Sequence, residues 1–342
     1  MAEVLVTGAT GFIGGHVARE LARRGADLRV LVRPQSRLEN LEGLRAERVV
    51  ADLREPASLR AAVRGCRLVF HLAADYRLWA PDPRQLYQSN VNGTANLLDA
   101  AAEAGVSRIV YTSTVGTIRP PALGQISDEE SPVSLEHMAG HYKRSKFLAE
   151  QAALERARRG VPVVIVNPTA PVGEADVKPT PTGKVILDFL RGRIPAYIDT
   201  GLNLVDVRAV AQGHLAAAER GRVGERYILG DRNMTLREIL LALARISGRR
   251  APRIRIPYAV AYAAAVVDTF LARWTGRPPA APLDALRMAR YKMFVRCDKA
   301  VRELGFQPGS VEEALQRAVV WFRERGYVTE AKQVRAAAPA KA

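Results

Sequence analysis

The fold is decided by one stretch near the N-terminus, Thr7-Gly8-Ala9-Thr10-Gly11-Phe12-Ile13-Gly14, with the spacing Gly-x-x-Gly-x-x-Gly. It follows a run of β-branched residues and opens a helical pattern. Gly8 permits a tight turn, Gly11 lets the backbone approach a pyrophosphate, and Gly14 lets the helix pack closely on the sheet. The N-terminus of that helix offers free N–H groups and a positive dipole end. The stretch therefore predicts a phosphate-binding turn between the first strand and the first helix.

Working outward from this turn, short β-branched runs alternate with helical patterns over the first 170 residues. The strand candidates are Val4–Thr7, Leu28–Val32, Arg48–Ala51, Leu68–His71, Arg108–Thr112 and Pro162–Val166. The helix candidates between them are Ile13–Arg24, Ala57–Arg64, Gln85–Glu103 and His141–Arg158. This repetition is typical of a parallel, doubly wound sheet with right-handed crossovers. We therefore predict an α/β fold of the Rossmann type for residues 1–170.

The regularity ends after Pro168, and residues 171–330 read as a smaller α/β lobe that covers the substrate. A loop is expected first, then helices and one segment that could extend the large sheet: Pro171–Gly183, Val185–Arg191, Leu236–Ile246, Val311–Arg323 and Glu225–Ile228. The last residues, 331–342, are rich in Ala, Pro and Lys and are predicted to form a flexible tail.

Charge and composition limit the partners that the chain is expected to have. The formal net charge of the 342 residues is +16, but the basic residues are spread along the chain rather than gathered in one arm. Nucleic acid is therefore not predicted as a partner, whereas a weak attraction to a membrane surface stays open. Cys66 and Cys297 lack the spacing of a disulfide framework or a zinc site, so no metal is predicted.

No signal peptide is visible before the first strand, which predicts a cytoplasmic location. The apolar stretch Ile256–Leu271 contains a proline and Asp268 and is too short to span a bilayer. It predicts a buried or surface-docked helix, with a helix lying at the inner membrane as the alternative.

The residues after the second and third strands indicate which dinucleotide is bound. Where folds that prefer NAD(H) carry an acid, this chain has Arg33, whose guanidinium suits a 2′-phosphate. NADP(H) is therefore predicted, with NAD(H) as the alternative. Asp52 and Leu53 are expected near the adenine, and the small residues of Leu72-Ala73-Ala74 let the cofactor lie close to the backbone.

The catalytic candidates are Tyr142 and Lys146, which share one face of a helix because they are four residues apart. A neighbouring ammonium is expected to stabilise the phenolate and so bring the pKa of Tyr142 into a useful range. Ser113 and Thr114 follow the preceding strand, where a hydroxyl can orient the substrate oxygen toward Tyr142. Together these residues predict hydride transfer at a carbonyl or alcohol carbon.

These motifs resemble the extended short-chain dehydrogenase/reductase superfamily, also called the NAD-dependent epimerase/dehydratase superfamily, over nearly the whole chain. Its further marks are Asn90-Val91-Asn92-Gly93-Thr94, Asn167-Pro168 and Glu303-Leu304-Gly305-Phe306-Gln307-Pro308. The resemblance adds Asn90, Thr112 and Pro168 to the expected cofactor site. It gives Lys146 a second role on the nicotinamide ribose and implies a homodimer. The superfamily's serine is matched here by Thr114.

More narrowly, the chain is similar to bacterial hopanoid-associated sugar epimerases and to dihydroflavonol 4-reductases. Three segments carry this similarity: Ala73–Trp79, Gly140–Lys146 and Lys178–Gly183. The resemblance implies a small-molecule or lipid-linked polyol or sugar substrate. The candidate substrate residues are Asp75, Tyr76, Arg77, Trp79, His141 and Asn203.

Two kinds of chemistry remain open on this fold. Nucleotide-sugar epimerases hold a diphosphate with an arginine where this chain has Leu202, so an NADPH-dependent reductase is favoured. A sugar epimerase or dehydratase with bound NAD is the alternative, because Arg208 or Lys178 could hold an anionic group. A non-catalytic dinucleotide sensor is a third hypothesis, against which the presence of both Tyr142 and Lys146 speaks.

Overall fold

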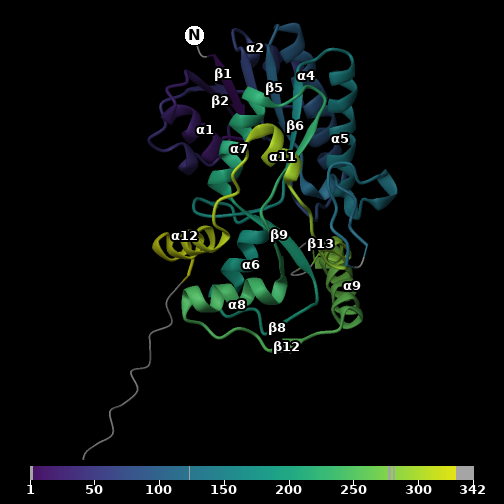
Figure 1. Cartoon of the computed structure of the whole chain (residues 1–342). Helices are drawn as coiled ribbons and strands as arrows, with labels where there is room; N and C mark the ends of the chain where they lie inside the picture. Colours follow the sequence, from purple (N-terminus) through teal and green to yellow (C-terminus); the bar gives the residue numbers. More distant parts are fainter. Residues whose placement is uncertain (1–2, 123, 276–278, 280–281, 329–342) are drawn as a thin grey trace, which may run out of the picture.

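The computed structural model describes residues 3–122, 124–275, 279 and 282–328. Within them the chain forms a large Rossmann-type layer and a smaller lobe beneath it (Figure 1). The tail predicted at 331–342 lies outside the described residues.

A seven-stranded parallel sheet forms the centre of the large layer, in the order β10-β6-β5-β4-β1-β2-β3. The strands are β1 (Val4–Thr7), β2 (Leu28–Val32), β3 (Glu47–Val50), β4 (Leu68–His71), β5 (Arg108–Thr112), β6 (Val163–Pro168) and β10 (Arg226–Leu229). Central strands such as β6 are buried along their whole length, which suits a sheet covered on both faces. The predicted doubly wound parallel sheet is confirmed.

Helices cover both faces of this sheet. On one face α1 (Phe12–Arg23) packs against α7 (Val207–Arg220), and their apolar sides join one buried cluster with the strands. The other face carries α2 (Pro56–Val63), α4 (Gly93–Glu103) and α5 (Gly140–Arg158). The helix predicted over Gln85–Glu103 is interrupted, because α3 (Arg84–Tyr87) continues into a π-helical turn at Gln88–Asn92 before α4.

The smaller lobe is built around β9 (Gly201–Asp206). It pairs with β7 (Ala170–Val172), antiparallel β11 (Arg232–Thr235) and β13 (Lys292–Met293). A separate cluster of buried apolar residues joins this sheet to α6 (Pro181–Leu190), α8 (Leu236–Ser247) and α12 (Val311–Glu324). A two-stranded sheet, β8 (Ala196–Tyr197) with β12 (Ile254–Arg255), lies at the lower edge (Figure 1).

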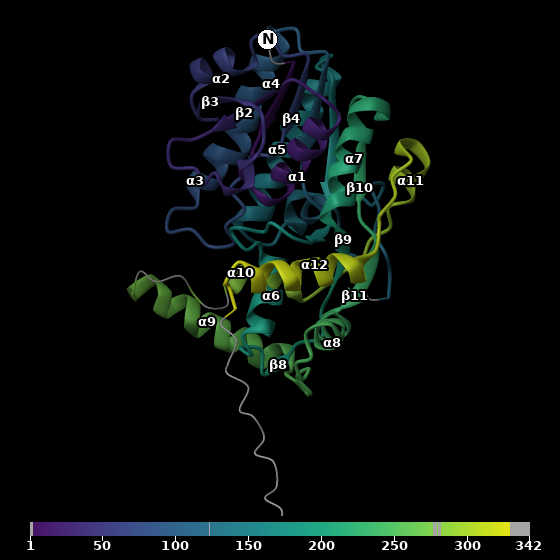
Figure 2. The ribbon, with the colours of Figure 1, turned by 90° about the vertical axis from the view of Figure 1, so that its left-hand side faces the viewer.

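The apolar stretch near residue 260 is helical, as predicted. It forms α9 (Tyr258–Thr275), which packs beside α10 (Leu283–Ala289) and projects from the body of the molecule in Figure 2. Across the described residues, no helix combines the length and the apolar character needed to cross a membrane.

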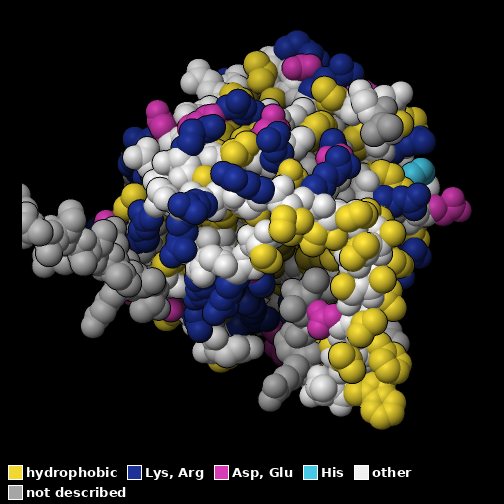
Figure 3. Space-filling view, turned by 90° about the horizontal axis from the view of Figure 1, so that it is seen from below, with side chains coloured by type: hydrophobic (Ala, Val, Ile, Leu, Met, Phe, Trp, Pro, Cys, Tyr) yellow, Lys and Arg dark blue, Asp and Glu magenta, His cyan; other side chains and the backbone are white. Residues whose placement is uncertain are grey.

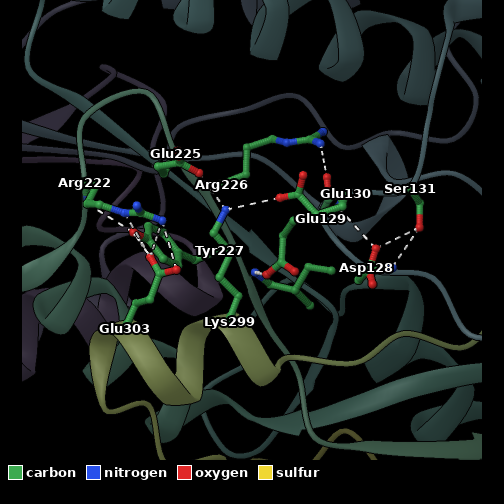
Figure 4. A network of polar contacts seen from close by, with 11 residues as sticks. Asp128, Glu129, Glu130, Ser131, Arg222, Glu225, Arg226, Tyr227, Lys299 and Glu303 are labelled. Atoms are coloured by element: carbon green, nitrogen blue, oxygen red, sulfur yellow. Dashed lines mark hydrogen bonds and ion pairs between the residues drawn. The ribbon is translucent and has the colours of Figure 1, made fainter.

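The predicted boundary at residue 170 does not separate the large layer from the lobe in space. After entering the lobe, the chain returns to the large sheet. β10 pairs with β6, α7 covers the sheet, and α11 (Asp298–Leu304) packs against both β10 and α7. A polar network fastens α11 to the large layer (Figure 4). Lys299 binds Glu225 at 2.6 Å, and Glu303 accepts hydrogen bonds from Arg222 and from Tyr227.

Candidate active site

The glycine turn brings α1 close to the backbone of the turn and leaves no room for side chains at two positions. Gly8 has φ +73°, and a Cβ there would lie 2.7 Å from the Ala73 backbone nitrogen. A Cβ on Gly14 would lie 2.1 Å from the Gly8 carbonyl oxygen, so only glycine lets α1 pack this closely on the turn. Gly11 begins α1 without a side-chain cap, and no acidic residue stands in the first helical turn. The helix N-terminus is therefore suited to an anionic ligand.

Side chains that the motif does not include hold this turn in place. Asn40 is buried and its amide donates to the carbonyl oxygens of Thr10 and Gly11. The Thr7 hydroxyl accepts a hydrogen bond from the Ala73 N–H and also bonds the ring of His71. The Thr7 hydroxyl is therefore used in hydrogen bonds within the protein. Asn40 was not predicted, because it lies outside the glycine motif and its neighbours in the sequence form no recognisable pattern.

At the adenosine end, Arg33 is exposed just after β2, where it is available to a phosphate. The carboxylate of Asp52, by contrast, is bound by the Arg54 guanidinium at 2.7 Å and by the Arg54 backbone N–H. These bonds with Arg54 hold the pKa of Asp52 below its usual value. Asp52 is therefore an anchored carboxylate rather than a free acceptor.

Tyr142 lies in the first turn of α5 and is half-buried there. Burial raises the pKa of Tyr142, although hydrogen bonding with the Thr114 hydroxyl lowers it. This direction is opposite to the expectation that Lys146 brings the pKa down. The amine of Lys146 instead donates to the Tyr111 hydroxyl at 2.9 Å and to the Thr112 carbonyl oxygen at 2.8 Å. The expectation fails because burial removes both Tyr142 and Lys146 from water, which raises the pKa of the phenol and lowers that of the amine.

Lys146 is itself almost fully buried, and burial lowers its pKa to about 7, with Glu150 acting in the opposite direction. An amine with this pKa changes its charge near neutral pH. Tyr111, which was missed by the sequence motifs, is the buried phenol that receives the Lys146 hydrogen bond.

The hydroxyl pair after β5 is shaped by a short helical turn at Val115–Thr117. Thr114 caps this turn and accepts a hydrogen bond from the Gly116 N–H at 3.1 Å. Ser113 is buried and lies 3.5 Å from the Thr117 hydroxyl, while Thr112 bonds His214. Of the three hydroxyls, Thr114 is the one that bonds Tyr142.

Asn90 links the loop after β4 to α5. Its amide nitrogen donates to the Ser145 hydroxyl and to the Asp75 carbonyl oxygen, and its oxygen accepts from the Asp75 N–H. These three bonds hold the Asn90 side chain within the protein. Pro168 ends β6, one residue after the buried Asn167, whose amide bonds Glu150 and Thr117.

A cleft of about 1090 Å³ opens beside the first turn of α5. Trp79 and His141, both predicted to contact substrate, line it together with residues from α9 and α10. Apolar side chains form much of its wall: Leu78, Trp79, Leu86, Met138, Ala272 and Leu283. Its charged side chains are Arg144, Asp284 and Arg287, none of which was predicted.

The remaining substrate candidates lie outside the wall of this cleft. Asp75 forms an ion pair with Arg77 at 2.5 Å, and the ring of Tyr76 lies under the Lys178 amine. Asn203 is buried in the lobe sheet. There its amide joins β9 to β11 and to the segment after β13. These bonds make Asn203 part of the lobe structure rather than of the cleft.

In nucleotide-sugar epimerases an arginine near the position of Leu202 binds the diphosphate of the substrate, and this chain has no free cation in the matching segment, which the structure describes in full. Leu202 packs against the apolar core of the lobe. Arg208 is held by Glu174 at 2.7 Å. The same Glu174 also binds Arg317, which reaches Asp206 as well.

Comparison with known proteins places this arrangement in a family. The model of the NAD dependent epimerase/dehydratase family matches residues 4–230. The chain belongs to that family. It is 46% identical to "Putative dihydroflavonol 4-reductase" of Synechocystis sp. over 94% of this chain and 95% of the relative.

Two further relatives match along nearly the whole chain. "Sterol demethylase protein B" of Methylococcus capsulatus is 36% identical over 95% of this chain and 99% of its own length. The crystal structure of gox2253 superimposes with a TM-score of 0.86 at 45% identity, covering 96% of this chain and all of that one.

Proposed function

We propose that this chain is an NADPH-dependent carbonyl reductase that forms an alcohol on a largely apolar, ring-containing or lipid-linked molecule. The observation that carries the proposal is the cleft beside the first turn of α5, the helix that carries Tyr142, because apolar side chains form much of its wall. In addition, Leu202 stands in the lobe core where a nucleotide-sugar epimerase would have the arginine that binds a diphosphate. The names of the Synechocystis and Methylococcus relatives, which refer to a dihydroflavonol and a sterol, support a substrate with fused rings. A hopanoid ketone belongs to the same chemical class.

Each step assigns a task to a residue of the site. When bound, the reduced nicotinamide would supply a hydride to the carbonyl carbon. The Tyr142 hydroxyl would donate its proton to the carbonyl oxygen, so that the C=O bond becomes an alcohol. Thr114, which bonds Tyr142, would hold that oxygen in reach. Arg33 would bind the 2′-phosphate and so select NADPH.

A panel of ketones tests this proposal. We expect that one NADPH is consumed for each alcohol formed. We also expect that this activity is lost in Tyr142→Phe. Isomerisation of a sugar without net consumption of NADPH would overturn it.

A sugar epimerase or dehydratase with bound NAD is the second candidate. It is favoured by Arg144, which lines the cleft and has no ion pair within the part of the chain that the structure describes. This cation is the group that would bind an anionic part of the substrate.

The homodimer and the cytoplasmic location stay predictions. Light scattering on the purified chain measures whether it forms a dimer.

A further inference from the structure

One face of α9 exposes a continuous apolar stripe. Its residues follow the spacing i, i+3, i+4, i+7, which places them on one side of a helix. Val267 and Phe270 are each 58% exposed, and Trp274 near the end of the helix is 81% exposed. We call this set the α9 stripe: Val260, Ala263, Ala264, Val267, Phe270, Leu271 and Trp274.

The opposite side of α9 is the one that the protein itself covers. Ala265 and Ala272 are buried there, 1% and 4% exposed. The Tyr258 hydroxyl donates to the Leu286 carbonyl oxygen of α10, and the Thr269 hydroxyl accepts from the Leu283 N–H. These contacts fix the helix on α10 from one side, so the α9 stripe faces away from the fold. Monomeric proteins rarely expose apolar patches of this extent without a partner.

An arginine-rich segment precedes α9 in the chain. Residues 239–267 contain five arginines and no acidic residue: Arg245, Arg249, Arg250, Arg253 and Arg255. Ile254, between two of them, is 65% exposed. Among the described residues only Arg255 of the five forms an ion pair, with Asp199. Figure 3 shows a group of Lys and Arg side chains on the underside of the molecule and, separate from it on the same face, a column of hydrophobic side chains.

We propose that the α9 stripe docks on the surface of an anionic lipid bilayer. An apolar helix face on the same side of the molecule as a group of basic side chains matches an interface where acyl chains lie beneath negative headgroups. The net charge of +16 favours the same partner. A second copy of the chain would instead bring an equally arginine-rich segment to the contact, where like charges repel.

Docking in this way would set the substrate cleft beside the bilayer, because Thr269 and Ala272 of α9 line that cleft. This consequence, a substrate drawn from the lipid phase, rests on the proposed function. The docking itself does not, since it needs neither substrate nor turnover.

Co-sedimentation of the full chain with vesicles tests the docking. The vesicles are phosphatidylcholine alone, or phosphatidylcholine mixed with phosphatidylglycerol. We expect retention on the mixed vesicles, weakened by added salt, and a loss of about tenfold in the double variant Phe270→Glu, Trp274→Glu. Val50→Glu, which changes an exposed valine on β3 that is 63% exposed, is the matched control and should bind as the unchanged chain does.

Circular dichroism and NADPH titration establish that the double variant is folded. Equal retention of that variant, or no retention of the unchanged chain, would overturn the proposal. A dimer in light scattering that the double variant converts to a monomer, without vesicle binding by the unchanged chain, would overturn it in favour of a second copy. Because no readout is enzymatic, these outcomes are independent of the reductase assignment.

Discussion

The Tyr142 hydroxyl is the group on which the proposed reduction depends. Burial raises the pKa of Tyr142, so the phenol carries its proton at neutral pH. A protonated phenol is the form needed to donate to the oxygen of a ketone while the carbon is reduced. The direction of the shift therefore agrees with a reductase acting in the direction of alcohol formation.

Replacing Tyr142 by Phe removes the proton donor and keeps the ring. We expect kcat for ketone reduction to fall by about 10²–10⁴-fold, with NADPH affinity nearly unchanged. Steady-state kinetics and a fluorescence titration measure the two quantities. Tyr291→Phe, at an exposed tyrosine that does not line the cleft, is the control. Full activity in Tyr142→Phe would remove this residue from the mechanism.

Arg33→Asp should reverse the choice of cofactor. A charge-assisted bond to a phosphate contributes about 1.5–3 kcal/mol, so we expect the Kd for NADPH to rise roughly 10–100-fold. The Kd for NADH should stay within a few-fold, because NADH has no 2′-phosphate. Arg45→Asp, the same charge change at another exposed arginine, should leave both values alone. An equal loss for both cofactors would mean that Arg33 does not select between them.

At the scale of elements, α1 and the glycine turn act as one unit. Gly14→Ala would push a methyl group to 2.1 Å from the Gly8 carbonyl oxygen, so α1 must move away from the turn. We expect a loss of about 1–3 kcal/mol of unfolding free energy and much weaker dinucleotide binding. Thermal unfolding and titration measure both.

Gly43→Ala provides the comparison, because a Cβ there meets nothing within 4 Å and only the positive φ of 71° opposes it. Its cost should be about 1 kcal/mol, with unchanged cofactor binding. If Gly14→Ala behaved like Gly43→Ala, the close packing of α1 would not matter for the cofactor.

The elements that the sequence predicts well are those whose pattern is local. β1, β2, β4 and β5 begin and end where their β-branched runs do. β8, β12 and β13 have two residues each, and their pairing is set by distant parts of the chain. α7 is not among the predicted helices. The π-helical turn at Gln88–Asn92 has no propensity signal of its own.

For the whole molecule, two buried histidines couple stability to pH. Burial lowers the pKa of His71 to about 3 and the pKa of His214 to about 4. Between about pH 4 and 6.5 the unfolded chain therefore binds protons that the folded chain does not. Their contribution to stability is complete above about pH 6.5 and is lost as the pH falls toward about 4 for His214 and about 3 for His71.

We expect the unfolding free energy to fall by about 1.4 kcal/mol per pH unit for each of these histidines over that range. Urea unfolding at a series of pH values measures the slope. His214→Gln should reduce the slope by about 1.4 kcal/mol per pH unit, the contribution of one histidine. A slope identical in the variant and the unchanged chain would mean that His214 is not the titrating group.

The site as a whole could be predicted only where its parts are contiguous. The glycine turn is encoded in the eight consecutive residues Thr7–Gly14, and the Tyr142–Lys146 pair lies within α5. The cleft is not, since Asp284 and Arg287 reach it from α10, more than a hundred residues after His141. Asp284 also lies against Gly140, whose φ of +79° and lack of a Cβ admit it. Such a contact depends on the packing of the lobe and leaves no local pattern.

The most direct test of the central claim, an NADPH-dependent reductase, is the identity and exchange of the dinucleotide. The purified chain is denatured, any released dinucleotide is identified, and the stripped protein is titrated with NADH and NADPH. We predict little retained dinucleotide and exchangeable binding with a clear preference for NADPH that Arg33→Asp abolishes. Tightly held NAD that survives purification would contradict the reductase assignment and favour the epimerase.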